Sequence, residues 1–416
     1  MAQDVSGTAG SFWKQSASVA RAIRPSGLAS ERRRALLVLF TYEVLCLTFL
    51  QKLAIPFAGG QVQAILPLTY VFILGLFFVS RPKLDLARLI LMVAFLISAL
   101  VSVLLLKSTY SANSIILLMA IYIPFIFYVE VGRSTYQKFL KIYLNVIMAL
   151  CFIILVQHAL QFIWSWKVWP NLDTIIGQNY NFQGYVYIQP IIYGSKFMKP
   201  NGIFMLEVSF VSQFIAIAIA LELVFFQRIT RLLIYSLALI STFAGTGLLL
   251  LAICAPVLLG RVNLRTLGGV IIIVFACILL ANRIQWYQQV EHRFGEFRQQ
   301  GGSANHRFIE PVDILFEVAQ RPASAITGLG PGSGEKGRSA FWWVSTKLAY
   351  EYGFLSTLTF LAFFGYTLFR NAPSQRIATL LFVMYNIMSG FIIPVYPFLI
   401  FLLGGLFRIR SSENAE

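Results

Sequence analysis

Apolar runs of roughly 20 residues recur along most of the chain, and short polar clusters separate them. Each helical span of a bilayer needs about 20 apolar residues, and only helices or closed barrels satisfy their backbone polar groups there. Only 12% of the residues are charged, whereas a soluble chain carries about 25%. The sequence therefore predicts an all-α polytopic membrane protein.

About twelve apolar spans can be placed along the chain. They cover residues 35–50, 62–80, 86–106, 114–130, 139–164, 203–226, 232–246, 247–260, 267–281, 341–369, 377–393 and 394–407. Basic clusters flank these spans, from Arg32–Arg34 to Arg408 and Arg410. Because Lys and Arg gather in cytoplasmic loops, twelve spans with a cytoplasmic amino terminus keep these clusters inside.

The expected organisation is a cytoplasmic segment 1–34, a single transmembrane domain 35–410 and a cytoplasmic tail 411–416. Two long loops, 165–202 and 282–340, then face outward. The apolar run after Arg34 has no small-residue cleavage pattern behind it, so it is interpreted as a retained span and not as a signal peptide.

Residues 232–260 leave the number of spans open. They form either two spans of about 15 residues, which is short, or one long tilted span. A single span would give eleven in total, would invert the rest of the chain and would place more of the 33 Lys and Arg residues inside. Gly245-Thr246-Gly247 at the midpoint favours two spans, because glycine permits a backbone break that a buried turn tolerates.

Basic side chains concentrate in the loop 282–340. They are Arg283, Arg293, Arg298, Arg307, Arg321, Lys336 and Arg338. Arginine forks match phosphate oxygens bidentately, so an outward-facing loop of this composition predicts an anion-binding surface. If the loop faces the cytoplasm, the same residues are topology anchors.

A helical pattern follows Ser303 inside this loop. Phe308, Val312, Phe316 and Ala319 recur at helical spacing, which predicts an amphipathic helix at the membrane surface or across the mouth of the bundle. Its first turn would present His306 and Arg307 to an anion. The glycine-rich segment 327–334 comes next, and its amides could close over a phosphate.

Two ionisable residues are candidates for acid–base chemistry. Glu207 lies just inside the outer end of a span, and an acid in the membrane is costly unless it has a role. His306 titrates near neutral pH and can transfer protons, although a loop histidine is more often merely solvated.

The loop 165–202 is rich in aromatic and amide side chains, including Trp169, Tyr185 and Tyr187. One interpretation is an aromatic belt at the membrane interface. The other is a carbohydrate-contacting surface, because flat rings stack on the apolar faces of sugars while amides pair with hydroxyls.

Several classes of function lack their signatures. The net charge of +16 is explained by cytoplasmic loops, and no nucleic-acid-binding module appears. The four cysteines, Cys46, Cys151, Cys254 and Cys277, form no CxxC pair, so neither a disulfide framework nor a metal site is expected. A transporter would be expected to show inverted repeats or charges paired at mid-membrane, and the sequence indicates neither.

Over roughly residues 195–370 the chain resembles the superfamily of O-antigen polymerases and O-antigen ligases. The matching motifs are Lys199-Pro-Asn-Gly202 leading into Glu207-x-Ser209, the break at Ser241–Gly247, Gly328-Leu-Gly330-Pro-Gly332, Glu351-Tyr-Gly353, and an Arg-x10-Gly pattern from Arg321 to Gly332. Ligases of the superfamily typically carry an Arg after Ser at the break, whereas this chain has Gly245-Thr-Gly247.

This resemblance implies a metal-independent membrane glycosyltransferase of the GT-C type, without a cofactor, in a bacterial inner membrane. Its donor and acceptor would be undecaprenyl-diphosphate-linked oligosaccharides, which it would join into polysaccharide at the periplasmic face. Partners would be membrane lipid and a chain-length regulator. The alternatives are a ligase that attaches polymer to lipid A core and, in a different class, a transporter or flippase.

On this hypothesis, positive charge stabilises the leaving diphosphate and a base deprotonates the attacking hydroxyl. His306 is the first candidate for the base and Glu207 the second. Candidate diphosphate contacts are Arg307, Arg321, Arg293, Arg298 and Lys199, and candidate sugar contacts are Trp169, Tyr185 and Tyr187.

Overall fold

The structure is a computed structural model of the chain and describes residues 27–57, 60–106, 111–191, 194–260, 268–269, 305–334, 342–388 and 393–410. It is mostly helical, at 73%. Among the described residues, four helices are long and apolar enough to cross a membrane: Leu86–Leu105, Arg133–Ile163, Val208–Phe226 and Val344–Phe369.

The helices that carry the fold are α2 (Gly27–Phe49), α3 (Ile65–Ser80), α4 (Leu86–Leu105), α5 (Ala112–Tyr122), α6 (Arg133–Ile163), α7 (Leu172–Ile175), α8 (Val208–Leu221), α9 (Ile229–Ser241), α10 (Gly245–Leu259), α13 (Glu310–Ala319), α14 (Pro322–Thr327), α16 (Val344–Phe369), α17 (Gln375–Met388) and α18 (Val395–Ile400). Helices α8 and α18 continue as π-helical turns over Glu222–Phe226 and Phe401–Gly405. The strands are β1 (Ala54–Phe57), β2 (Gly60–Gln63), β3 (Lys83–Leu84), β4 (Phe127–Val131) and β5 (Phe407–Ile409).

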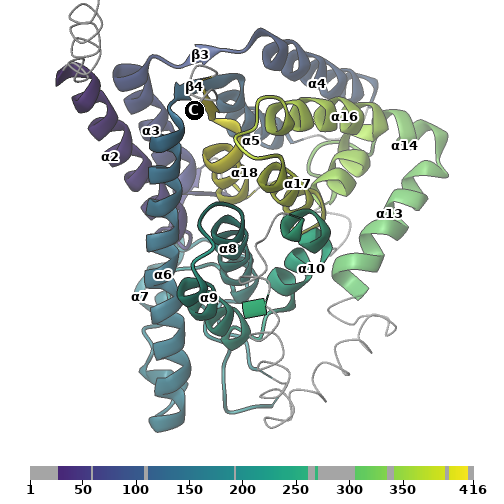
Figure 1. Cartoon of the computed structure of the whole chain (residues 1–416). Coiled ribbons are helices and arrows are strands. Elements are labelled where there is room, and N and C mark those ends of the chain that lie inside the picture. The colour runs from purple at the N-terminus through teal and green to yellow at the C-terminus, as the bar shows by residue number, and fades with distance from the viewer. Residues whose placement is uncertain are drawn as a thin grey trace, which may run out of the picture.

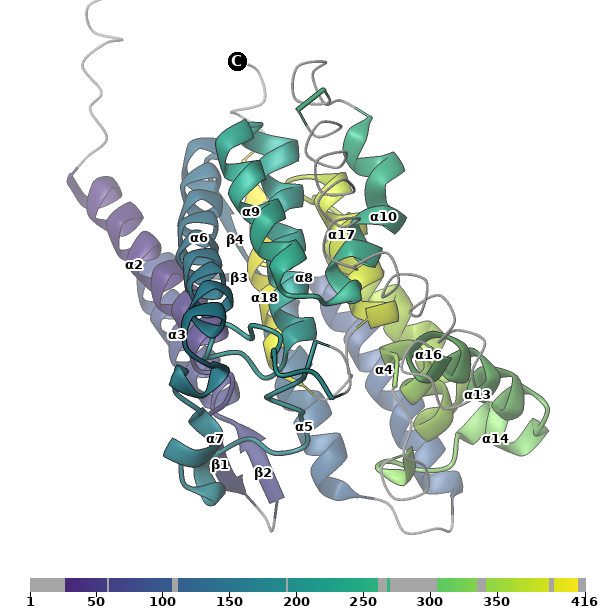
Figure 2. The ribbon, with the colours of Figure 1, turned by 90° about the horizontal axis from the view of Figure 1, so that it is seen from below.

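The long helices lie side by side in one bundle. Figure 2 looks across it, with β1, β2 and α7 at the lower left, α13 and α14 at the lower right, and the carboxyl terminus at the top. In Figure 1, α6 runs down the left of the picture, and α13 and α14 lie at the right-hand periphery beside α16. The surface helices α13 and α14 therefore cover one edge of the bundle at the end away from the carboxyl terminus.

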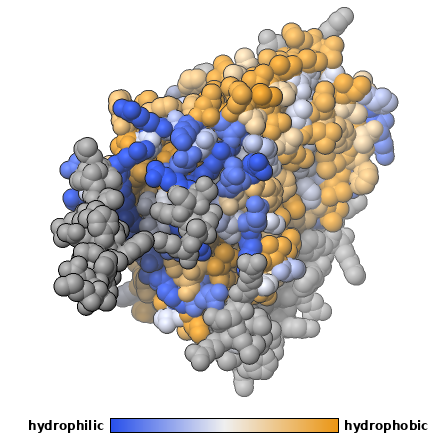
Figure 3. Space-filling view, turned by 45° about the horizontal axis from the view of Figure 1, so that its top comes forward, coloured by the Kyte–Doolittle hydropathy of each residue, from blue (hydrophilic) through white to orange (hydrophobic). Residues whose placement is uncertain are grey.

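The flank of the bundle is apolar. On α4 the exposed large side chains recur at helical spacing: Ile90, Val93, Ile97, Leu100 and Leu104. Figure 3 shows a broad hydrophobic flank next to a region where hydrophilic residues gather. An exposed apolar stripe of this extent is typical of a helix that faces lipid, which agrees with a membrane protein.

Residues 229–259 form two helices, as the glycine break predicts. The chain leaves α9 at Ser241 and begins α10 at Gly245. Arg228 before α9 pairs with Glu222 at the carboxyl end of α8, whereas Thr246 in the first turn of α10 contacts Ser212 near the amino end of α8. Helix α9 therefore runs back along α8, and α10 then reverses direction again.

Basic clusters that are far apart in the sequence meet at one end of the bundle, which we call the basic end. Arg32 donates a hydrogen bond to Ser80 O, Lys83 pairs with Glu130 at 3.0 Å, and Arg408 pairs with Asp85. A small three-stranded sheet, β3–β4–β5, joins these segments, with β4 antiparallel to β3 and parallel to β5.

The sheet corrects the prediction of one continuous span over residues 114–130. Helix α5 ends at Tyr122, a short 3₁₀ turn follows over Ile123–Ile126, and Phe127–Val131 is strand β4. Pro124 in this turn has no N–H to continue a helix, so the backbone of the following residues pairs across strands instead.

An amphipathic helix is present in the second long loop, but it buries a different face than predicted. A π-helical turn over Asn305–Ile309 precedes α13. Ile314 and Val318 are buried, and Trp342, Tyr350 and Phe354 complete their cluster at the start of α16. Phe316, expected on the buried face, is 61% exposed.

Candidate functional site

A cavity of about 1340 Å³ lies at the end of the bundle opposite the basic end. Glu207 before α8 and Lys347 in the first turns of α16 line it. The far ends of the same two helices reach the basic end, where Glu222 pairs with Arg228 and Thr367 O accepts a hydrogen bond from Arg88. The cavity is thus separated from the basic end by the length of these helices.

Glu207 and Arg307 face each other across this cavity. Arg307 Nη2 lies 3.6 Å from Glu207 Oε1, and Ser209 Oγ donates a hydrogen bond to the same carboxylate oxygen. Glu207 sits at the N-cap of α8 without capping the helix through its side chain. Its carboxylate is therefore directed to the cavity side, where a base for a ligand hydroxyl would have to be.

Arg307 is held by its backbone as well as by Glu207. Trp343 Nε1 donates a hydrogen bond of 2.9 Å to Arg307 O, which fixes the turn before α13 against the start of α16. Burial of Ile314 and Val318 fastens the rest of α13 to α16. The guanidinium is thus anchored from a segment that lies far from Glu207 in the sequence.

Lys347 is a site residue that the sequence reasoning missed. Its side chain is 4% exposed and lines the cavity, and its Nζ lies 4.0 Å from Glu351 Oε1 one helical turn further on. The available signal was a lysine four residues before a glutamate inside an apolar span, where an ionisable residue is costly and marks function.

One wall of the cavity is apolar and opens to the flank of the bundle. Val71 and Leu74 on α3 and Ile116 on α5 line the cavity, and each is also among the large exposed hydrophobic residues. A single side chain can do both only where a cavity opens to the outside. The cavity therefore opens to the outside of the molecule along an apolar side.

His306 and Arg321 lie away from the cavity lining. His306 Nδ1 contacts Glu310, and the histidine side chain is partly exposed. Arg321 is 59% exposed and pairs with Glu317 at 3.0 Å on the surface. Among the described residues of this loop that were expected to contact a diphosphate, Arg307 is the one that the structure brings to Glu207.

The remaining candidate cations divide into two cases. Arg293 and Arg298 lie outside the described residues. Lys199 is buried, its N–H donates to Gln189 O at 2.8 Å, and it is not among the residues that line the cavity.

The glycine-rich segment 327–334 does not offer its amides to a ligand as expected. Leu329 N donates to Tyr350 O at 2.7 Å and Gly330 N donates to Glu351 O at 3.0 Å. These carbonyls are available because Gly353, with φ +81°, breaks the helical hydrogen bonding of α16. These amides therefore donate to carbonyl groups that the kink in α16 leaves without a helical partner, because buried backbone polar groups need hydrogen-bond partners.

The expected sugar-contacting aromatics take three different positions. Tyr185 lines the cavity, with its ring edge-on to Phe210 at 5.5 Å. Trp169 lines a separate apolar cavity of about 340 Å³ beside α6. Tyr187 is buried, which corrects its expected role as a surface for a sugar.

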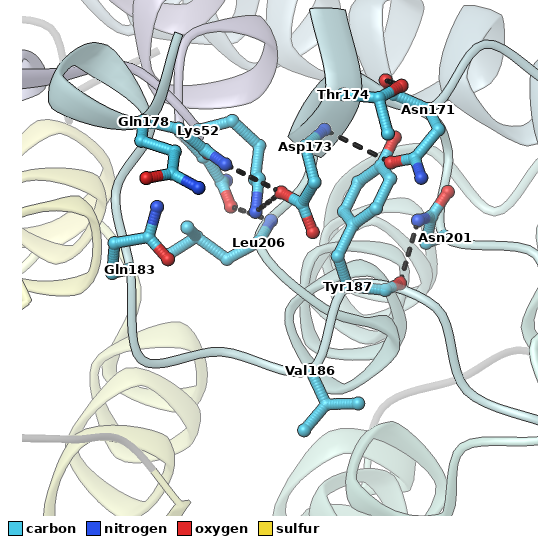
Figure 4. Close-up of polar contacts among 12 residues, drawn as sticks. Lys52, Asn171, Asp173, Thr174, Gln178, Gln183, Val186, Tyr187, Asn201 and Leu206 are labelled. Carbon is cyan, nitrogen blue, oxygen red and sulfur yellow. Dashed lines mark hydrogen bonds and ion pairs between the residues drawn. The ribbon is translucent and has the colours of Figure 1, made fainter. Parts of the chain in front are cut away.

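Tyr187 belongs to a polar cluster that ties the loop 165–202 to the end of α2 (Figure 4). Lys52 Nζ lies 2.5 Å from Asp173 Oδ1 and 4.7 Å from the centre of the Tyr187 ring. Burial raises the pKa of Tyr187 to about 12, so its hydroxyl remains protonated and donates to Ile203 O. The cluster is structural and carries the loop that presents Tyr185.

The fold and the cavity define a helical membrane protein with a largely apolar cavity at one end that also holds the charged residues Glu207, Arg307 and Lys347. Comparison of the chain with family models, with curated proteins and with solved structures found no match. In the described part of the chain, no group of three or more His, Cys, Asp or Glu side chains is arranged to hold a metal ion.

Proposed function

We propose that this protein joins lipid-linked oligosaccharides into polysaccharide at the outer face of a bacterial inner membrane. The donor would be a sugar chain on a polyprenyl diphosphate, and the acceptor a hydroxyl of another lipid-linked oligosaccharide. The proposal combines the superfamily resemblance with one observation: the cavity joins a carboxylate and two cations to an apolar opening on the flank. A ligand that fits has an anionic polar head and an apolar tail.

The distribution of charge supports this orientation. Cytoplasmic loops are enriched in Lys and Arg, so the basic end is expected to face the cytoplasm and the cavity to face outward. The reversals at α8, α9 and α10 support the twelve-span arrangement, with both chain termini inside. A GT-C-type enzyme that uses lipid-linked sugars outside the cell membrane requires this sidedness.

The proposed reaction transfers a glycosyl group. The bond between the sugar's anomeric carbon and the diphosphate oxygen breaks, and its electron pair leaves with the diphosphate. The acceptor hydroxyl oxygen forms the new bond to the anomeric carbon, and its proton goes to Glu207. Arg307 would stabilise the charge that develops on the leaving diphosphate.

Glu207 is favoured over His306 as the base because it lines the cavity and His306 does not. Arg307 at 3.6 Å attracts the Glu207 carboxylate electrostatically. A diphosphate that draws Arg307 toward itself would release the carboxylate to accept a proton from the acceptor hydroxyl. Substrate binding and proton transfer would then be coupled through one guanidinium.

The first test is elongation by the purified protein. Full-length protein in lipid nanodiscs, given a polyprenyl-diphosphate-linked oligosaccharide and no ion gradient, should produce longer lipid-linked chains. A ligase would leave that substrate unextended but would transfer it when lipid A core is supplied. Transport of the lipid-linked sugar across vesicles without elongation would refute the proposal.

The second test is sidedness. Gln320→Cys places a thiol at the exposed end of α13, and Gln375→Cys places one at the start of α17 near the basic end, each in a chain lacking the four native cysteines. In intact spheroplasts an impermeant maleimide should label position 320 and leave position 375 unlabelled until lysis. The reverse pattern would put the cavity in the cytoplasm and exclude the proposed reaction.

A further inference from the structure

Lys347 occupies a position that is costly for a lysine. It lies in the second turn of α16, and its side chain is almost fully buried. A buried cation requires compensating anionic or polar contacts.

The start of α16 is fastened to the segment that carries Arg307. Trp343 Nε1 donates to Arg307 O at 2.9 Å, and Thr346 Oγ1 donates to Pro311 O at 3.5 Å. Both donors lie within the four residues before Lys347, and they hold the start of α16 against residues 305–311. Lys347 and Arg307 therefore line the same cavity from two adjoining elements.

Glu351 lies one helical turn after Lys347 and attracts its side chain. Its Oε1 atom lies 4.0 Å from Lys347 Nζ, and the glutamate is fully buried. A charge-assisted hydrogen bond measures about 2.7–2.9 Å, so this carboxylate attracts the ammonium without closing such a bond at that atom. The same is true of Arg307 and Glu207 at 3.6 Å.

A glycine contact fixes Glu351 in turn. A Cβ on Gly328 would clash with the backbone of Glu351, and one on Gly353 would clash with Ile326 O. Only glycine permits this approach of two backbones, so the segment 326–330 clamps α16 at its kink. The backbone of Glu351, whose carboxylate lies beside the Lys347 ammonium, is thus fixed by contacts with the segment 326–330.

We propose that Lys347 is a second cationic contact for the phosphate groups that Arg307 binds, and that Glu351 is the residue that positions it. This rests on the proposed function for the identity of the ligand, a lipid diphosphate. Two cations on adjoining elements can contact both phosphates of a diphosphate, and an anion adds to the compensation that Glu351 gives a buried lysine.

The test is binding of farnesyl diphosphate to the full-length detergent-purified protein. Lys347→Met keeps the volume and removes the charge, and we expect it to weaken binding by 10-fold or more. Lys347→Arg should stay within about 3-fold of the wild type, and Glu351→Gln, measured on protein that remains folded, should weaken binding. Lys83→Met, at the basic end, removes the same charge and should bind like the wild type.

Inorganic pyrophosphate is the second probe. If the ligand is a lipid diphosphate, pyrophosphate should compete with farnesyl diphosphate but bind more weakly; equal affinity would indicate a free diphosphate. Wild-type affinity for farnesyl diphosphate in folded Lys347→Met would overturn the inference, as would an absence of binding by the wild type. Binding that depends on Lys347 in a protein that does not elongate sugars would refute the proposed function and leave this inference standing.

Discussion

Arg307 Nη2 lies 3.6 Å from Glu207 Oε1, which joins the turn before α13 to the N-cap of α8. Neither residue is close to the other in the sequence, and neither lies within a helix that would fix it alone. The pair assembles because residues 305–319 are held against α16, through buried Ile314 and Val318 and through the hydrogen bond from Trp343 to Arg307 O. It gives the cavity both a candidate base and a candidate anion contact.

Glu207→Gln tests the candidate base. The substitution keeps the size and polarity of the side chain but removes its capacity to accept a proton, so we expect kcat for elongation to fall by about 10²–10⁴-fold. The measurement is the initial rate with purified protein of unchanged thermal stability. Ser209→Ala removes only the hydroxyl that hydrogen-bonds Glu207 and should have a much smaller effect. Wild-type turnover in Glu207→Gln would exclude it as the base.

A matched pair of substitutions distinguishes the role of Arg307 from that of Arg321. Arg307→Ala should lower the rate of elongation by about 10²–10³-fold, because a preformed donor to the leaving group is lost. Arg321→Ala removes an exposed pair with Glu317, so its effect should stay within about 2-fold. Both rates are measured at saturating substrate. A larger loss of elongation rate in Arg321→Ala would indicate that Arg321 belongs to the site.

Tyr185 and Tyr187 should differ in what they affect. Tyr185→Ala removes an aromatic wall of the cavity, and we expect a raised KM for the oligosaccharide with little change in stability. Tyr187→Phe removes a buried hydroxyl that donates to Ile203 O, so we expect a loss of about 1 kcal/mol in the free energy of unfolding and a retained KM. Kinetics and thermal unfolding on both variants check the contrast, and an unchanged KM in Tyr185→Ala would argue against sugar contact.

Gly353→Ala should destabilise the protein. Gly353 adopts φ +81° and ψ 171°, a region essentially restricted to glycine, and strain there costs about 1–3 kcal/mol before the clash with Ile326 O is counted. Gly245→Ala is the control, since a Cβ at this position, the start of α10, would meet nothing within 4 Å. The unfolding temperature should fall clearly for Gly353→Ala and not for Gly245→Ala. Equal unfolding temperatures for the two variants would show that α16 tolerates a different kink.

Asp85 should make the stability of the basic end depend on pH. Burial acts to raise the pKa of Asp85, but hydrogen bonds from Arg408 and the Arg88 N–H, together with the charges of both arginines, outweigh it and hold that pKa below its usual value. A lowered folded-state pKa stabilises the protein above the unfolded-state pKa of about 3.9, and this contribution is lost as the pH falls below it.

Asp85→Asn should therefore reduce stability at pH 7 by about 3–5 kcal/mol, because Arg88 and Arg408 lose their buried counter-charge. The difference in thermal stability from the wild type should shrink below about pH 4. Glu130→Gln disrupts the exposed pair with Lys83 and should cost less than about 1 kcal/mol at any pH. A pH-independent difference for Asp85→Asn would contradict this account.

Local signals in the sequence pointed to two of the residues that line the cavity. Glu207 stood out as an acid near the end of an apolar span, and Arg307 as an arginine at the start of an amphipathic helix. Lys347 was missed because it reads as one more lysine near a span end, and its burial depends on tertiary packing. Tyr187 and Tyr185 are two residues apart and equally aromatic, so only packing separates the buried ring from the one in the cavity.

The sequence by itself determined that this is a helical membrane protein, that residues 229–259 contain a break, and where most helices lie. These follow from hydropathy, proline and glycine, which act within a few residues of chain. Only the tertiary structure decided that Glu207, Arg307 and Lys347 share one cavity while His306 and Arg321 lie outside it. Side chains from separate helices meet according to how those helices pack. Here the packing depends on the burial of Ile314 and Val318, which is a property of the whole bundle and not of the local sequence.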